Sequence, residues 1–268
     1  MTAGKTAFFG IMDTEQKRRV VSWFSCGAAS AVATKLALKQ YSERVEIVYQ
    51  DTGSEHPDNK RFLKDCERWF GREITVLKSK KYNSIWEVFE KTRYLVGPMG
   101  ARCTSELKRK LAEEYITWGP LQDVEIFGYT VEEEPRLKRF RSNNPERIIE
   151  CPLIDKALNK TECLAILERE KIQIPKMYEL GYKNNNCIGC VKGGAGYWNK
   201  IRKDFPDVFA RMAAVERELD IAINKRYVDG ERMKVFLDEL PEEMGNFETE
   251  PSISCGLFCD AVVRNIST

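Results

Sequence analysis

The chain has 268 residues, a length that accommodates one large domain with an appendage and a substantial buried core. Its 43 Lys and Arg residues nearly balance 41 Asp and Glu residues, and this net charge of +2 does not support a nucleic-acid partner. The sequence lacks both an apolar run that could cross a membrane and the apolar core of a signal peptide. We therefore expect a cytoplasmic protein without a membrane partner. One histidine, His56, is too few for a His-rich zinc hydrolase site.

Apolar, β-prone runs alternate with helical patterns along the first part of the chain. The predicted strands are residues 20–24, 45–49, 74–77, 124–129 and 148–153. A helix is expected after the second strand, from Pro57 to about Phe70. This alternation predicts an α/β fold with a doubly wound, mostly parallel sheet. Ligands of such sheets lie beyond the carboxyl ends of the strands, where Ser25, Asp51 and Gly128 fall.

The pattern changes near Gly181, where three asparagines, a cysteine pair and a Gly-rich stretch precede amphipathic helical stretches. We predict a nucleotide-binding α/β domain at residues 1–182. Residues 183–268 are predicted to form a cysteine-containing C-terminal extension that packs on the first domain. Residues 1–18 show no clear period and are expected to form a loose arm.

The first predicted strand leads into a turn of small residues and then a helix-prone run. The turn comprises Ser25, Cys26, Gly27, Ala28, Ala29 and Ser30. Small residues let backbone N–H groups approach an anion, and the dipole of the following helix favours negative charge there. The sequence continues with neither a Walker lysine nor GxGxxG spacing. This pattern alone is compatible with a phosphate-binding loop and also with a tightly packed turn that binds nothing.

The same six residues resemble the PP-loop, Ser-Gly-Gly-x-Asp-Ser, of the adenine nucleotide α-hydrolase superfamily. Cys26 stands at a glycine position of that motif, and Ala29 stands where ATP-splitting members have an Asp that helps to handle magnesium pyrophosphate. The resemblance implies an adenine nucleotide α-hydrolase-like fold. It also implies an adenine nucleotide ligand (PAPS, APS or ATP), with the loop at its phosphates.

Two further segments resemble the phosphoadenosine phosphosulfate (PAPS) reductase family. Residues 51–57 are similar to its Asp-Thr-Gly-x-x-Phe-Pro segment. Residues 128–136 are a looser match to its Gly-x-Arg-x-x-Glu-Ser segment, with Thr130 in place of the Arg and Glu134 in place of the Ser. The resemblance implies nucleotide contacts from Asp51, Thr52, Gly53, Ser54, Gly128, Glu133 and Arg136. A solvated basic loop is the alternative for Arg136 and the basic residues that follow it.

Nine cysteines are many for a chain expected in a reducing compartment, where they indicate metal or redox chemistry rather than disulfides. Cys187 and Cys190 form a C-x2-C pair beside turn-forming residues, a spacing that lets two thiolates hold one metal site. Residues 102–109 resemble the Cys-Cys-x-x-x-Lys segment of iron–sulfur sulfonucleotide reductases, with Arg102 in place of the first Cys. This resemblance implies that Cys103 is a third ligand.

The tail segment 254–259 resembles the Glu-Cys-Gly-Leu-His tail that carries the nucleophilic Cys of PAPS and adenosine phosphosulfate (APS) reductases. The resemblance implies that Cys255 is the nucleophile and forms an S-sulfocysteine, which a thioredoxin-type thiol clears as sulfite. Cys259 is then expected to complete the metal site, although a rival interpretation makes Cys255 the fourth ligand. The expected cofactor is an iron–sulfur cluster of the 4Fe–4S type. The alternative is a zinc site of Cys187, Cys190, Cys255 and Cys259.

These motifs occur in the family's order over most of the chain, which resembles most the divergent members carried by bacteriophages. We therefore predict a sulfonucleotide reductase-like oxidoreductase acting on PAPS or APS. One alternative is an ATP-dependent enzyme that adds sulfur to nucleic acid, which the Lys- and Arg-rich stretch 60–110 favours and Ala29 disfavours. Another is a non-catalytic nucleotide-binding protein with a structural metal.

Overall fold

The fold is described from a computed structural model of the chain, which covers residues 17–97, 100–253 and 255. Its contacts divide these residues into two compact units. Unit 1 contains the residues up to 50, 57–77 and 112–179, and unit 2 contains 51–56, 78–111 and the residues from 180 onward. The last segment of unit 2 begins close to the predicted boundary at 182, but two earlier segments pack with it. The expected loose arm lies almost entirely outside the described residues.

Unit 1 is built on a five-stranded sheet with the order β3-β2-β1-β6-β7. In chain order these strands are β1 (Val20–Trp23), β2 (Val45–Asp51), β3 (Thr75–Lys78), β6 (Val124–Ile126) and β7 (Ile148–Glu150). The pairs β1–β2, β1–β6 and β6–β7 are parallel. Strands β2 and β3, which follow β1 in the chain, lie on one side of it, and the later strands β6 and β7 lie on the other. The strand order therefore reverses at β1, as in doubly wound sheets. The predicted α/β fold is confirmed.

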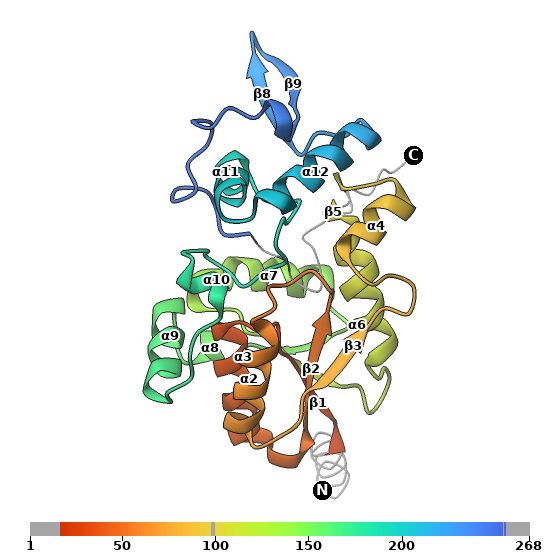
Figure 1. Ribbon diagram of the computed structural model, residues 1–268. Helices are drawn as coiled ribbons and strands as arrows, with labels where there is room; N and C mark the ends of the chain where they lie inside the picture. Colours follow the sequence, from red (N-terminus) through yellow and green to blue (C-terminus); the bar gives the residue numbers. More distant parts are fainter. Residues whose placement is uncertain (1–16, 98–99, 254, 256–268) are drawn as a thin grey trace, which may run out of the picture. The chain divides into compact units, whose positions relative to one another are not determined.

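Helices flank this sheet (Figure 1). The α-helices are α2 (Ala28–Tyr41), α3 (Asn59–Phe70), α6 (Lys110–Tyr115), α7 (Glu134–Asn143), α8 (Pro152–Asp155), α9 (Lys160–Arg169) and α10 (Lys176–Glu179). Short 3-10 turns are η1 (Ser42–Arg44) and η3 (Val131–Glu133). Within the described residues, no helix combines the length and apolar character needed to cross a bilayer.

The core of unit 1 lies between the sheet and the helices α2, α3 and α9. All four residues of β1 are buried, as expected for a central strand of a parallel sheet covered on both faces. Phe24 follows β1 and packs against Phe62 and Phe70 of α3, with ring centroids 6.3 and 5.8 Å apart. This packing fixes the point at which the chain leaves the central strand.

Unit 2 consists of helices and two small antiparallel ribbons. Its helical elements are α4 (Ile85–Thr92), α5 (Arg102–Thr104), the π-helical turn η2 (Ser105–Arg109), α11 (Ala195–Asp204), α12 (Pro206–Leu219) and η4 (Leu237–Glu239). One ribbon pairs β4 (Val96–Gly97) with β5 (Gly100–Ala101), and the other pairs β8 (Asn224–Val228) with β9 (Glu231–Val235). The second ribbon, which we call the hairpin, lies in a segment that the sequence did not predict to contain strands.

A buried carboxylate fixes both ends of the hairpin. Glu216 of α12 is fully buried. Its Oε1 accepts a hydrogen bond from the N–H of Ile223, just before β8, and its Oε2 accepts one from Leu237, shortly after β9, both at 2.6 Å. Burial raises the pKa of Glu216 to about 7, although the two N–H donors favour the charged form.

We predict that Glu216 makes the protein less stable as the pH rises from 4.5 to about 7. In this window the native state keeps a proton on Glu216 that the unfolded chain has released, so the free energy of unfolding falls with rising pH, by about 3 kcal/mol at most. Glu216→Gln should remove this part of the pH profile in urea titrations. Glu218→Gln, which changes an exposed carboxylate of the same helix, is the matched control. An identical pH profile in the Glu216 variant would contradict the prediction.

Candidate functional site

The turn after β1 is organised by the hydroxyl of Ser30. This oxygen accepts hydrogen bonds from the N–H groups of Ser25 and Gly27 at 3.1 and 3.3 Å and from the Ser25 hydroxyl at 3.0 Å. It donates to the Gly27 carbonyl at 3.0 Å. The loop is thereby folded over the first turn of α2, a 14-residue helix whose N-terminus favours an anion.

Cys26 acts on this loop through its backbone conformation and through its buried thiol. Its φ of 60° lies in the left-handed region, which costs a residue with a side chain about 1–2 kcal/mol and explains why the similar PP-loop motif has Gly there. The side chain is fully buried, and its Sγ lies 3.6 Å from the carbonyl oxygen of Asn59. The thiol therefore anchors the strained loop to the start of α3.

The chain leaving β6 approaches the same loop at Gly128. A Cβ atom at this position would lie 2.7 Å from the backbone of Ser30, so only glycine fits without a shift of the loop. Gly27 has its own close neighbour, because a Cβ there would lie 3.0 Å from the hydroxyl of Tyr178. The loop and Gly128 follow adjacent strands at the point where the strand order reverses, which is where doubly wound sheets bind ligands.

Glu133 and Arg136, both predicted to contact nucleotide, pair with each other. The ion pair between Arg136 Nη1 and Glu133 Oε1 measures 2.7 Å. The Arg136 guanidinium lies 4.6 Å from the centre of the Tyr129 ring, and its buried Nε has no hydrogen-bond partner among the described residues. The two residues are therefore preorganised, and their contact with a nucleotide remains a prediction.

The sequence analysis did not predict two residues that lie beside this loop. Tyr178 reaches Gly27, and Lys160 places its Nζ 5.2 Å from the centre of the Tyr178 ring. Burial lowers the pKa of Lys160 against the opposing effect of Glu133 and Glu132. No motif spacing could reveal these residues, because only the packing of α9 and α10 brings them close to the loop.

Unit 2 contains the second group of interest, the thiols of Cys103, Cys187, Cys190 and Cys255, which we call the thiol cluster. The C-x2-C turn is held by Tyr197, whose hydroxyl accepts from the N–H groups of Gly189 and Cys190 at 3.1 and 2.9 Å. Gly189 has a φ of 78°, and a Cβ there would lie 2.7 Å from Val208. The turn conformation thus requires this glycine between the two cysteines.

The Asp-Thr-Gly segment lies directly against the C-x2-C turn. The Thr52 hydroxyl is 3.0 Å from Cys187 Sγ, and the Ser54 carbonyl accepts from the N–H of Ile188 at 2.9 Å. Gly53 has a φ of 67°, and a Cβ there would lie 2.0 Å from the carbonyl of Asn83. Asp51 forms an ion pair with Lys78 at 2.7 Å. The structure thus gives this segment a role in positioning a cysteine, while its nucleotide contacts remain a prediction.

Cys103 and Lys108 reach the cluster from one irregular helix. Cys103 lies in α5 and Lys108 in the π-helical turn that follows, a type of turn often found at functional sites. Burial alone would lower the pKa of Lys108, but electrostatic attraction to Cys255, Cys187, Glu55 and Cys103, in that order, outweighs burial and raises the pKa.

The four thiols differ in their electrostatic surroundings. Burial raises the pKa of Cys103 and Cys187, and raises that of Cys190 to about 12. Burial acts the same way on Cys255, yet Lys108 and Lys192, helped by the Thr104 hydroxyl at 3.6 Å, lower its pKa. Cys255 is therefore the thiol that ionises most readily.

Cys255 thus interacts with three of the four cysteines that were predicted as ligands, Cys103, Cys187 and Cys190, and the fourth, Cys259, lies outside the described residues. In the described part of the chain, no three His, Cys, Asp or Glu side chains converge closely enough to hold one metal ion. The roles of Cys255 and Cys259 stay predictions.

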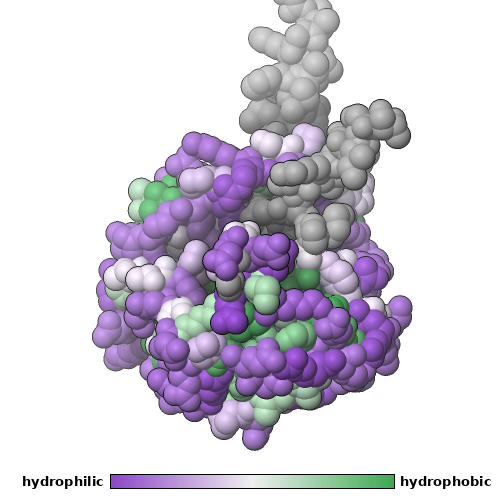
Figure 2. Space-filling model, turned by 90° about the horizontal axis from the view of Figure 1, so that it is seen from above, coloured by the Kyte–Doolittle hydropathy of each residue, from purple (hydrophilic) through white to green (hydrophobic). Residues whose placement is uncertain are grey.

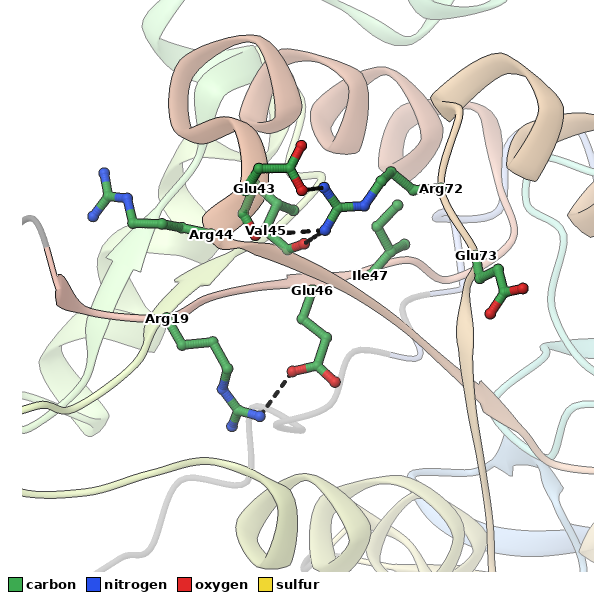
Figure 3. A pocket seen from close by; sticks show the side chains of 8 residues that line it. All are labelled: Arg19, Glu43, Arg44, Val45, Glu46, Ile47, Arg72 and Glu73. Atoms are coloured by element: carbon green, nitrogen blue, oxygen red, sulfur yellow. Dashed lines mark hydrogen bonds and ion pairs between the residues drawn. The ribbon is translucent and has the colours of Figure 1, made fainter.

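A pocket of about 270 Å³ lies at the opposite end of β2, where the strand begins (Figure 3). Two ion pairs neutralise much of its lining, Arg19 with Glu46 at 2.8 Å and Arg72 with Glu43 at 2.6 Å. Ligands of parallel sheets bind at the carboxyl ends of the strands, so this pocket is not the candidate site.

A family model shows which family the chain belongs to. Residues 19–194 match the model of the phosphoadenosine phosphosulfate reductase domain, and the chain belongs to this family. An uncharacterized protein of Methanocaldococcus jannaschii is 28% identical over 209 residues, which cover 75% of this chain and 42% of the relative. The chain thus spans less than half the length of this curated relative. A solved phosphoadenylyl-sulfate reductase from Candida auris is similar over 62% of this chain and 81% of its own, with a TM-score of 0.43 and 13% identity.

We predict that Ser30→Ala weakens the binding of an adenine nucleotide by about tenfold, because the loop loses the acceptor that gathers its N–H groups. Isothermal calorimetry with PAPS, APS and ATP measures the effect. Ser142→Ala removes an exposed helix hydroxyl in the same unit and is the control. Equal affinities of both variants and the unaltered protein would exclude the loop as the nucleotide site.

We also predict that Lys108→Met raises the pKa of Cys255 in metal-free, reduced protein, because the charge that lowers this pKa most is lost. Alkylation of Cys255 by iodoacetamide at neutral pH, followed by mass spectrometry, should slow several-fold. Lys110→Met removes a more exposed ammonium, which pairs with Glu106, and should leave the rate unchanged. Equal rates in both variants would contradict the role assigned to Lys108.

Proposed function

We propose that the protein is a sulfonucleotide reductase-like oxidoreductase that acts on PAPS or APS. The observation that carries the proposal is the thiol cluster with two lysines beside it, in a chain that belongs to the PAPS reductase domain family. A reductase of this class needs both an adenine-nucleotide site and reactive thiols, and the chain offers a candidate for each.

The nucleotide would bind at the loop of residues 25–30. The hydroxyl groups of Ser25 and Ser30 and the N-terminus of α2 offer donors to a phosphate. Arg136, with its buried Nε, offers a cation for a second anionic group of the substrate. Lys160, beside Tyr178, adds another positive charge near the loop.

The thiol cluster is suited to a 4Fe–4S cluster. Its donors are four sulfur atoms, the ligand type that iron–sulfur centres use, and they come from α5, from the C-x2-C turn and from the tail. Lys108 and Lys192 supply positive charge against the thiolates that such binding requires. When bound, the cluster would supply a fixed anionic centre that holds these segments together.

The surroundings of Cys255 favour an exchange of the two roles predicted for the tail. Cys255 interacts electrostatically with Cys103, Cys187 and Cys190, as a fourth ligand would. We therefore assign Cys255 to the cluster and Cys259 to the attack on the substrate. The opposite assignment, with Cys255 as the nucleophile, draws support from the lysines that stabilise its thiolate.

The proposed reaction balances with one external dithiol. A cysteine thiolate of the tail attacks the sulfate sulfur, the bond from that sulfur to the bridging phosphate oxygen breaks, and the nucleotide leaves with its phosphate. The enzyme then carries S-sulfocysteine. A thiol of a thioredoxin-type reductant attacks the cysteine sulfur and releases sulfite. The resulting mixed disulfide resolves to the oxidised reductant and the free enzyme thiol, so two electrons have passed to the sulfur.

We predict that protein purified without oxygen is brown, contains iron and acid-labile sulfide, and releases sulfite from PAPS or APS when a thioredoxin is supplied. Cys255→Ser should lose most of its iron, because a ligand is gone. Cys259→Ser should keep its colour, its iron and its nucleotide affinity, yet form no sulfite and gain no sulfonate mass.

Matched controls and contrary outcomes follow from the same measurements. Cys66→Ser changes a buried cysteine of unit 1 and should keep both iron content and activity. A brown Cys255→Ser protein that lacks activity, beside a colourless Cys259→Ser protein, would restore the original assignment. Stoichiometric zinc without iron would establish the zinc alternative. An iron-containing protein that binds ATP and releases no sulfite from either sulfonucleotide would refute the proposed reaction.

A further inference from the structure

The hairpin of unit 2 projects away from helices α11 and α12 (Figure 1). Residues 225–227 and 231–234 are exposed, whereas Asn224 and Val235 at the base of the hairpin are buried. Tyr227 is 65% exposed and Met233 is 45% exposed. A two-stranded ribbon with both faces in solvent has little core of its own, so its side chains are available to a partner.

The hairpin is nevertheless held in a defined conformation. Asp229 and Gly230 have φ values of 53° and 82°, as in the type I′ turn that matches the twist of two-stranded ribbons. At the base, Glu216 binds the backbone on both sides of the ribbon. The ribbon is therefore an ordered hairpin and not an irregular loop.

Its two faces carry different chemistry. Lys225 is paired directly with Lys234, and Tyr227 with Arg232, so these four side chains share one face. That face, which we call the cationic face, contains three cations, one aromatic ring and no carboxylate. The other face carries Arg226, Met233 and Glu231.

The cationic face is incompletely neutralised. Lys234 pairs with Asp220 at 3.0 Å, but Lys225 and Arg232 form no ion pair with any residue that the structure describes. Like charges directly opposite each other destabilise a ribbon, and Lys225 lies opposite Lys234, so an external anion beside Lys225 would relieve this repulsion. Seen from above, the molecule shows mostly hydrophilic residues with scattered hydrophobic ones (Figure 2).

We propose that the cationic face of the hairpin binds nucleic acid. Lys225 and Arg232 would contact phosphates, and Tyr227 would stack on an unpaired base. The combination of cations with an exposed ring favours nucleic acid over an acidic protein. An acidic protein would pair with the cations but would offer the ring no base to stack on. The two-stranded ribbon also fits a duplex major groove, so single-stranded and duplex probes are both needed. This proposal does not depend on the proposed reductase chemistry.

Fluorescence anisotropy with the full-length protein tests the proposal, using a labelled oligothymidylate and a labelled mixed-sequence duplex over a series of salt concentrations. Wild-type protein should bind at least one probe, more weakly as salt rises. Lys225→Gln combined with Arg232→Gln should weaken binding about tenfold at low salt and reduce the log–log salt slope by about 1.4 for the single strand or 1.8 for the duplex. Tyr227→Ala should weaken binding to the single strand about tenfold and spare the duplex if stacking is used.

Arg226→Gln is the matched control, because it removes the same charge from the opposite face of β8. It should change affinity and slope much less than Lys225→Gln or Arg232→Gln alone, and these single variants decide the outcome if the double variant does not fold. Wild-type protein that binds neither probe would overturn the proposal. So would an Arg226 variant as impaired as the others, or a labelled polyglutamate bound as tightly as the oligonucleotides. All hairpin variants should keep their iron content and nucleotide affinity, which separates this test from that of the proposed reaction.

Discussion

In unit 2, a lysine ammonium and the sulfur atoms around it stabilise each other electrostatically. Lys108 keeps a raised pKa only because Cys255, Cys187 and Cys103, with Glu55, lie close enough to offset its desolvation. The same interaction, seen from the other side, lowers the pKa of Cys255. Residues 51–56 and 78–111, which contain Glu55, Cys103 and Lys108, cluster with the C-terminal part of the chain, which contains Cys187 and Cys255. These segments supply charged groups near the thiol cluster, such as Glu55 and Lys108, and a contact to one of its cysteines, that of Thr52 with Cys187.

Close backbone approach is the second constraint, and it appears in both units. Gly128 lies against Ser30, and Gly53 lies against Asn83, at distances that no side chain permits. Cys26 keeps a left-handed conformation without being glycine, at a cost that its buried side chain must offset. Such departures from local preference are expected at functional sites, where geometry is selected over stability.

The sequence predicted the elements whose signals are local. Strands β1, β2 and β3 and helix α3 fall close to their predicted ranges, because apolar runs and turn residues mark them. The turn after β1 was also predicted, because its small residues stand between an apolar run and a helix-prone run. The contact between Thr52 and Cys187 was not predictable, because it joins residues 135 positions apart that belong to motifs with separate explanations. Lys160 and Tyr178 escaped for the same reason.

The hairpin was missed although its signal is local. An Asp-Gly pair between two runs of alternating side chains is a strong hairpin pattern. The surrounding segment is mostly acidic and has a helical pattern, so neither the strands nor their basic residues were predicted. A net charge of +2 describes the whole chain, but recognition depends on the field at one surface. Alternation along β8 and β9 places Lys225, Arg232 and Lys234 on one face and Glu231 on the other. Strand pairing thus places opposite charges on opposite faces, although they cancel in the net charge of the sequence. The composition therefore could not exclude a polyanionic partner.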